Sequence, residues 1–108
     1  MRTVLVSVTL ALLLVVRPLD RVAVKGKTRG SMIYELIGLA GQVDDTLIAK
    51  AERHGRALDA YFAQRWDEAI DLLAADDAAA RVIRDRAMLF RTSPPPADWD
   101  GIHRATSK

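Results

Sequence analysis

Two β-prone runs decide the fold: they read LDRVAVKGK at residues 19–27 and MIYELI at residues 32–37. The first contains two valines and the second two isoleucines and a tyrosine, which favour strands. Gly26 and Gly30 bracket the polar segment between them, and glycine relaxes the backbone where a chain reverses direction. The pattern therefore predicts a β-hairpin.

A nearly unbroken apolar run, from Val4 to Val16, precedes the hairpin. Within it, Val4 to Ser7 favours a strand and Leu10 to Leu14 favours a helix, so we expect a buried strand and a short helix. The alternative is a signal peptide with Arg2 as its positive start, or a membrane anchor. Against this, the run has about 13 residues where a membrane span needs about 20, and no Ala-x-Ala cleavage site follows it.

From Asp44 onward the hydrophobic period becomes helical, with apolar residues at spacings of three and four. We expect three helices joined by short turns, each begun by acidic residues: Asp44 or Asp45, then Asp67 and Glu68, then Asp76 and Asp77. Pro94-Pro95-Pro96 ends the helices, because proline has no amide hydrogen and clashes with the preceding turn. The predicted buried stripes are Leu47, Ile48, Ala51, Gly55, Leu58, Tyr61 and Phe62; Trp66, Ala69, Ile70 and Leu73; and Ala79, Val82, Ile83, Ala87 and Phe90. The tail is expected to be irregular, with Trp99 docked back on the helices.

The composition excludes several kinds of site. The chain has 108 residues, no cysteine and two histidines, so a disulfide framework, a cysteine-based zinc site and a cysteine nucleophile are ruled out. Residues 1–43 carry six basic and two acidic side chains, whereas residues 44–108 carry ten basic and twelve acidic ones. This split favours two segments with different tasks in a chain of one small domain's length.

The hairpin sequence resembles a known family. LDRVAVKGK followed by Ile33-Tyr34-Glu35-Leu36 is similar to the last β-hairpin of the class III adenylate/guanylate cyclase catalytic domain. Upstream, Val4-Leu5-Val6-Ser7-x-Thr9 resembles the strand and short helix that precede that hairpin in the family. The helical half, with Pro94-Pro95-Pro96-Ala97-Asp98-Trp99-Asp100-Gly101, resembles the C-terminal extension of bacterial cyclases, often those with an N-terminal extracellular CHASE2 sensor. The resemblance covers nearly the whole chain but only the final part of a much larger enzyme.

This resemblance implies an α+β fold. Residues 1–41 would be a strand, a short helix and a hairpin of the cyclase domain, residues 42–93 a three-helix tetratricopeptide-like segment, and residues 94–108 a Pro-rich irregular tail. Ala57, Trp66, Ala69 and Leu73 fall at spacings like the packing positions of a tetratricopeptide repeat. Only about one and a half units fit, and about three are needed for an independent solenoid. A plain helical hairpin that covers the sheet is therefore an equal alternative.

Cyclases of this family use two metal-bearing aspartates, an Asn/Arg pair and base-selecting residues, with Mg or Mn and ATP or GTP. The resemblance places those motifs upstream of the portion present here, and Asp20, Asp44 and Asp45 are not at matching positions. We therefore expect no catalytic residue, no metal site and no cofactor in this chain. We predict that it has no cyclase activity alone.

One family residue does match. Lys25, in Val24-Lys25-Gly26, resembles the lysine that contacts the terminal phosphates of the nucleotide. An ammonium there offsets charge on the leaving pyrophosphate, and glycine permits close backbone approach. The alternative, favoured for the isolated chain, is a solvated lysine at a strand end. We expect Arg21, Lys27 and Arg29 to be solvated charges without a specific ligand.

Other candidate residues give weak signals. We expect His54 to be a packing histidine beside the apolar stripe, and His103 has no evident partner in the tail. Ser7, Ser31 and Ser93 lack a Gly-x-Ser-x-Gly context, and no P-loop is present. Nucleic-acid binding is not expected, because the basic segment has no interleaved aromatics beyond Tyr34.

The sequence thus predicts a truncated or remnant adenylate/guanylate cyclase of the cyclic-nucleotide signalling family, cytoplasmic, with weak or absent nucleotide binding. One alternative is a non-enzymatic interaction module that forms a homodimer or binds a protein partner through its helical segment. The other is a small exported or membrane-anchored protein led by residues 1–16.

Overall fold

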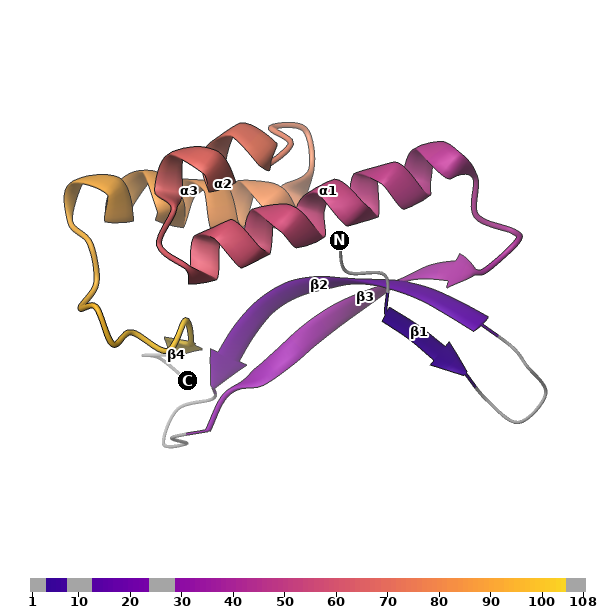
Figure 1. Cartoon of the computed structure of the whole chain (residues 1–108), viewed down its shortest axis with the longest axis horizontal. Helices are drawn as coiled ribbons and strands as arrows, with labels where there is room; N and C mark the ends of the chain where they lie inside the picture. Colours follow the sequence, from indigo (N-terminus) through magenta and orange to yellow (C-terminus); the bar gives the residue numbers. More distant parts are fainter. Residues whose placement is uncertain (1–3, 8–12, 24–28, 105–108) are drawn as a thin grey trace.

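The computed structural model describes residues 4–7, 13–23 and 29–104. Its strands are β1 (Val4–Ser7), β2 (Leu13–Ala23), β3 (Ser31–Leu39) and β4 (His103–Arg104), and its helices are α1 (Asp45–Phe62), α2 (Trp66–Leu72) and α3 (Ala78–Thr92). The helices form a layer over a curved sheet, with α1 running along the sheet and α2 and α3 packed behind it (Figure 1). The predicted α+β class is confirmed.

The predicted hairpin is formed by β2 and β3, which pair antiparallel, and β1 joins the other edge of β2. Strand β2 begins earlier than expected, at Leu13. The prediction of helix was therefore wrong for Leu13 and Leu14; residues 10–12 lie outside the described part. Leu14 pairs with Val6 on one side and Leu39 on the other, and this pairing outweighs the small intrinsic helix preference of leucine.

Pro18 lies inside β2, although proline cannot donate a hydrogen bond to a neighbouring strand. The pairing of β2 with β3 shifts register between Pro18 and Asp20. A proline is tolerated at such an irregularity, because the ladder is already interrupted there. The strand therefore continues through Arg17-Pro18, where the apolar run of the sequence ends.

The helix boundaries follow the predicted signals. Asp44 accepts a hydrogen bond from the Leu47 amide at 2.9 Å, and Asp77 accepts one from the Ala79 amide at 3.0 Å, so both cap their helices. Helix α3 ends at Thr92, shortly before the three prolines.

The hydrophobic core lies mainly within the helical layer. Its buried residues are Ala57, Leu58, Ala60, Tyr61, Ala69, Leu73, Ala80, Ile83 and Ala87. The many alanines allow the helices to approach closely, and the aromatic and branched residues fill the remaining space. Two residues of the predicted stripes are instead exposed, Leu47 at 45% and Val82 at 49%, because they lie at the border of the buried face.

Residues 96–104, which we call the C-terminal strap, fold back over the molecule (Figure 1). The Trp99 ring lies 5.3, 5.7 and 5.4 Å from the rings of Tyr61, Trp66 and Phe90, as the sequence predicted. The tail is not wholly irregular, since β4 pairs in parallel with the end of β2.

Among the described residues, no helix combines the length and the apolar character that crossing a membrane requires.

Candidate functional site

The predicted phosphate-contacting residue, Lys25, lies outside the described residues, as does Lys27. The structure does describe the strands on either side of residues 24–28. Strand β2 is defined as far as Ala23, and the chain is described again from Arg29, which is exposed, into β3 at Ser31. The surroundings of these two strand ends are therefore the candidate site.

The C-terminal strap lies against both strand ends. Val22 pairs with His103 and Ala23 with Arg104. On the other strand, a Cβ atom added to Gly30 would lie only 2.7 Å from Cγ1 of Ile102. The absence of a side chain at Gly30 is thus what lets the strap approach.

Arg21 does not have the solvated role that we expected for it. Its Nη1 donates a hydrogen bond of 2.5 Å to the carbonyl oxygen of Asp100, and its guanidinium lies 4.2 Å from the centre of the Phe62 ring. A cation over an aromatic face is attracted by the ring's π electrons. Arg21 therefore links the hairpin both to α1 and to the strap.

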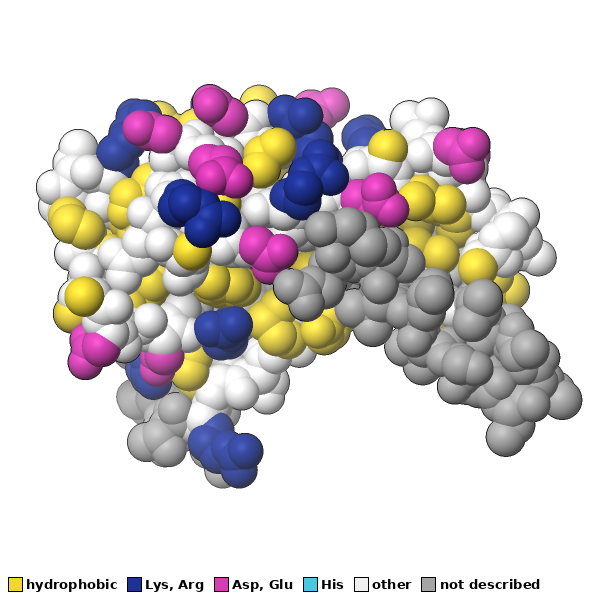
Figure 2. All heavy atoms as spheres, in the orientation of Figure 1, with side chains coloured by type: hydrophobic (Ala, Val, Ile, Leu, Met, Phe, Trp, Pro, Cys, Tyr) yellow, Lys and Arg dark blue, Asp and Glu magenta, His cyan; other side chains and the backbone are white. Residues whose placement is uncertain are grey.

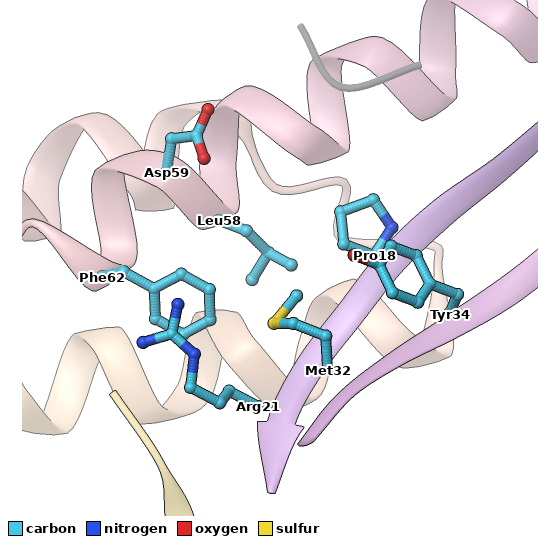
Figure 3. A pocket seen from close by; sticks show the side chains of 7 residues that line it. All are labelled: Pro18, Arg21, Met32, Tyr34, Leu58, Asp59 and Phe62. Carbon is cyan, nitrogen blue, oxygen red and sulfur yellow. The ribbon is translucent and has the colours of Figure 1, made fainter. Parts of the chain in front are cut away.

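A small pocket lies between α1 and the hairpin. Leu58 and Phe62 project from the helix toward Met32 and Arg21 (Figure 3), and the pocket has a volume of about 130 Å³. Since one water occupies about 30 Å³ of liquid, a few waters fit. A whole nucleotide does not fit, because pockets for molecules of that size span about 300–1,000 Å³. Its lining residues are Pro18, Arg21, Met32, Tyr34, Leu58, Asp59 and Phe62.

An ionic cluster around the buried Arg17 holds the hairpin to the helices. The Arg17 side chain is only 11% exposed; its Nε donates to Glu35 at 2.6 Å and its Nη1 to Asp77 at 2.5 Å. The hydrogen bond from Arg17 lowers the pKa of Asp77 to about 2. Asp77 is therefore ionised at neutral pH and pairs with the Arg17 cation.

His54, on α1 beside this cluster, is buried at 4% exposure. Burial lowers its pKa, and the Arg17 cation lowers it further. Its Nε2 has no hydrogen-bond partner among the described residues. His54 is thus buried and packed as predicted, but its hydrogen-bonding capacity is not fully used.

The acidic residues considered as metal ligands have structural roles. Asp20 accepts a hydrogen bond of 2.7 Å from Arg86, and Asp44 caps α1. Within the described residues, no group of three or more His, Cys, Asp and Glu side chains is placed to hold a metal ion. The remaining candidates are separated in the fold: Ser7 lies in β1, Ser31 begins β3, Ser93 follows α3 and His103 is exposed in β4.

Sequence reasoning missed the importance of Arg17 and Arg86. Arg17 was visible only as the residue that ends an apolar run, and Arg86 only as a charge within a helix. Their acidic partners are distant in sequence, so no local pattern marks either pair.

No protein-family model, no curated protein and no solved structure matches this chain. The helical layer carries basic and acidic side chains interspersed, without a broad surface of one sign in the view of Figure 2.

Proposed function

We propose that this chain is the terminal part of a class III adenylate/guanylate cyclase domain joined to a tetratricopeptide-like extension. Its role would belong to cyclic-nucleotide signalling in the cytoplasm. The observation that carries the proposal is the LDRVAVKGK sequence at residues 19–27, followed by IYEL at residues 33–36. The antiparallel pairing of β2 with β3 supports it, because the resemblance requires a hairpin at this place.

In this proposal Lys25 contributes a cation to a phosphate-binding surface that the rest of the catalytic domain completes. An ammonium at such a position stabilises negative charge as pyrophosphate leaves. The metal-bearing aspartates of the family have no counterpart in the sequence, so ATP or GTP with Mg or Mn would be held by another polypeptide segment. The chain alone is proposed to be inactive.

A complementation assay tests this. The purified chain is mixed with a class III cyclase catalytic domain from which the terminal hairpin has been deleted, and cyclic AMP and cyclic GMP are measured with Mg or Mn. We expect no product from either component alone and product from the mixture. Lys25→Ala should lower that activity about a hundredfold. The exposed lysine of α1 provides the matched control, Lys50→Ala, which should have no effect.

Cyclic nucleotide formed by the chain alone would refute its predicted inactivity. A mixture without activity, or one whose activity Lys25→Ala leaves unchanged, would refute the assignment to the cyclase hairpin.

A second candidate is a helical interaction module without enzymatic activity. It is favoured by apolar side chains exposed on α3, of which Leu89 is 63% and Val82 49% exposed, since exposed apolar surface is a common feature of protein-binding sites. It predicts that a fragment of residues 44–108 is folded and retains a partner. An unstructured fragment by circular dichroism would exclude it.

A further inference from the structure

Strand β3 forms one edge of the sheet. The strand order is β1-β2-β3, so within the described residues β3 is hydrogen-bonded to β2 on one side and to no strand on the other. Every residue from Ser31 to Leu36 has a partner in β2, which makes this stretch regularly extended. The outer side of such a strand presents backbone N–H and C=O groups. It therefore has the hydrogen-bonding groups to accept one more strand.

The composition of β3 does little to prevent such pairing. Lysine and proline commonly protect the edges of sheets, and Ser31–Leu39 contains neither. Its one charged residue, Glu35, accepts a hydrogen bond of 2.6 Å from Arg17. The register shift within β3 lies beyond Leu36, so it interrupts only the end of the strand. The regular part of the edge is thus open to a further strand.

A row of apolar side chains follows this regular stretch. Met32, Tyr34 and Leu36 alternate along β3 and so project from one face of the sheet. Met32 and Tyr34 both line the pocket beneath α1 (Figure 3). Tyr34 is 46% and Leu36 60% exposed, although β2 and α1 lie beside them. The row therefore leaves apolar surface uncovered at the edge.

The row is symmetrical about Tyr34, which suits pairing of the strand with itself. In an antiparallel pair with Tyr34 opposite Tyr34, Met32 of each copy lies opposite Leu36 of the other. On the other face, Ile33 lies opposite Glu35, so no carboxylate directly faces another carboxylate. Apolar and aromatic cross-strand pairs stabilise a sheet, whereas directly opposed like charges destabilise it. This register provides the former and avoids the latter.

The charges at the two ends of β3 favour the same arrangement. Arg29 precedes the strand and is exposed, and Asp45, which is also exposed, begins α1 shortly after the strand ends. Antiparallel pairing brings the basic end of one copy toward the acidic end of the other, whereas parallel pairing brings like ends together. Charge complementarity and the symmetrical apolar row thus identify one occupant, a second copy related by a two-fold axis.

We propose that this chain forms a homodimer in which the β3 strands of two copies pair antiparallel, centred on Tyr34, so that one sheet continues across both. The proposal is independent of the cyclase assignment and places the dimer contact on the sheet, away from the exposed face of α3. A contact of one strand pair lies at the small end of interface sizes, so we expect a dissociation constant of about 10 μM.

Sedimentation equilibrium of the full chain over a range of concentrations measures the association. Leu36→Lys places an ammonium at the edge and should raise the dissociation constant about tenfold or more. Because Leu36 is 60% exposed, the monomer should keep its fold, which circular dichroism checks. The matched control is Leu89→Lys on α3, where the leucine is 63% exposed; it should leave the dissociation constant unchanged.

Single cysteine variants test the register, because the natural chain has no cysteine. Directly opposite residues of antiparallel strands have Cα atoms about 4.5–5.5 Å apart, within the range of about 4.4–6.8 Å that a disulfide spans. Under mild oxidation Tyr34→Cys should therefore form a covalent dimer. In Ile33→Cys the two cysteines are offset along the strands by more than about 7 Å, so this control should crosslink poorly.

Three results would overturn the proposal. The first is a chain that stays monomeric up to about 500 μM, where a dimer of the expected affinity would predominate; the edge would then be left for a strand of another protein. The second is a dimer that Leu89→Lys weakens as much as Leu36→Lys does, which would place the contact on the helices. The third is equal or greater crosslinking of Ile33→Cys compared with Tyr34→Cys.

Discussion

Arg17 and Asp77 are separated by 60 positions in the chain, yet their side chains meet through two hydrogen bonds, from Nη1 at 2.5 Å and from Nη2 at 3.2 Å. Arg17 belongs to the hairpin and Asp77 begins α3. The same carboxylate accepts hydrogen bonds from the amides of Ala79 and Ala80. One residue therefore both starts a helix and fixes that helix to the sheet.

The substitution Asp77→Asn should lower the free energy of unfolding by about 2 kcal/mol, because it leaves the buried Arg17 guanidinium incompletely paired. Asparagine is as good a helix cap as aspartate, so the change isolates the ionic interaction. Urea denaturation monitored by circular dichroism measures it.

The matched control is Asp67→Asn, which removes the partner of Arg91 in a pair where the two side chains are 80% and 48% exposed, respectively. It should cost about 0.5 kcal/mol or less. Equal losses in the two variants would show that burial of Arg17 is unimportant.

The pKa of Asp77 falls from 3.8 to about 2 in the folded state. Its contribution to stability is therefore complete above the unfolded pKa and is lost as the pH falls through 3.8 toward 2.

His54 should make the protein less stable in mild acid. Burial lowers its pKa below 6.5, so the unfolded chain binds a proton at a pH where the folded chain does not. The free energy of unfolding should then decrease as the pH falls below 6.5. Arg17, Asp77 and Glu35 also act on its pKa, the first lowering it and the two carboxylates raising it.

The melting temperature measured between pH 7.5 and 5 reports this effect. In His54→Gln the decrease over that range should be smaller, whatever the substitution costs at neutral pH. In His103→Gln, where the histidine replaced is exposed, the decrease should match that of the unmodified chain. If the decrease in melting temperature were smaller in His103→Gln and unchanged in His54→Gln, His103 would be its cause and the prediction would be wrong.

Trp99→Ala should lower the free energy of unfolding by about 3 kcal/mol, because it removes a ring packed against three other aromatic rings. We expect the near-ultraviolet circular dichroism of the aromatic cluster to weaken as well. Tyr34→Ala provides a comparison at a ring that is 46% exposed, and its effect should be below about 1 kcal/mol. A loss for Trp99 no larger than that for Tyr34 would contradict the docking of the strap.

Gly101→Ala should destabilise the protein by two separable effects. Its φ of 78° disfavours any side chain, and an added Cβ would lie 2.7 Å from Cδ1 of Phe62. Gly41 has φ of 89° with nothing within 4 Å of an added Cβ, so Gly41→Ala measures the conformational cost alone, about 1 kcal/mol. The loss for Gly101→Ala should exceed it, as measured by thermal unfolding. Equal losses would mean that the Phe62 ring moves away from the added methyl group without a cost in stability.

Much of the fold follows from local sequence signals. The hairpin was predictable from two β-prone runs with glycines between them, and the helices from their hydrophobic period and from Asp44 and Asp77 as caps. The docking of Trp99 was also expected, since a large apolar ring in a short tail is more stable when it is buried. For the candidate site, the sequence offers only the resemblance at Lys25, which lies outside the described residues and stays a prediction.

Other features depended on contacts between distant segments. Leu13 and Leu14 favour a helix locally, but pairing with β1 and β3 makes them part of a strand. The partners of Arg17 and Arg86, and the packing of Ile102 on Gly30, have no local signature, because charge and shape select partners only after the helical layer is brought onto the sheet. The sequence by itself therefore determined which segments are strands and helices over most of the chain. The tertiary structure alone decided how the strap, the helices and the hairpin end are joined.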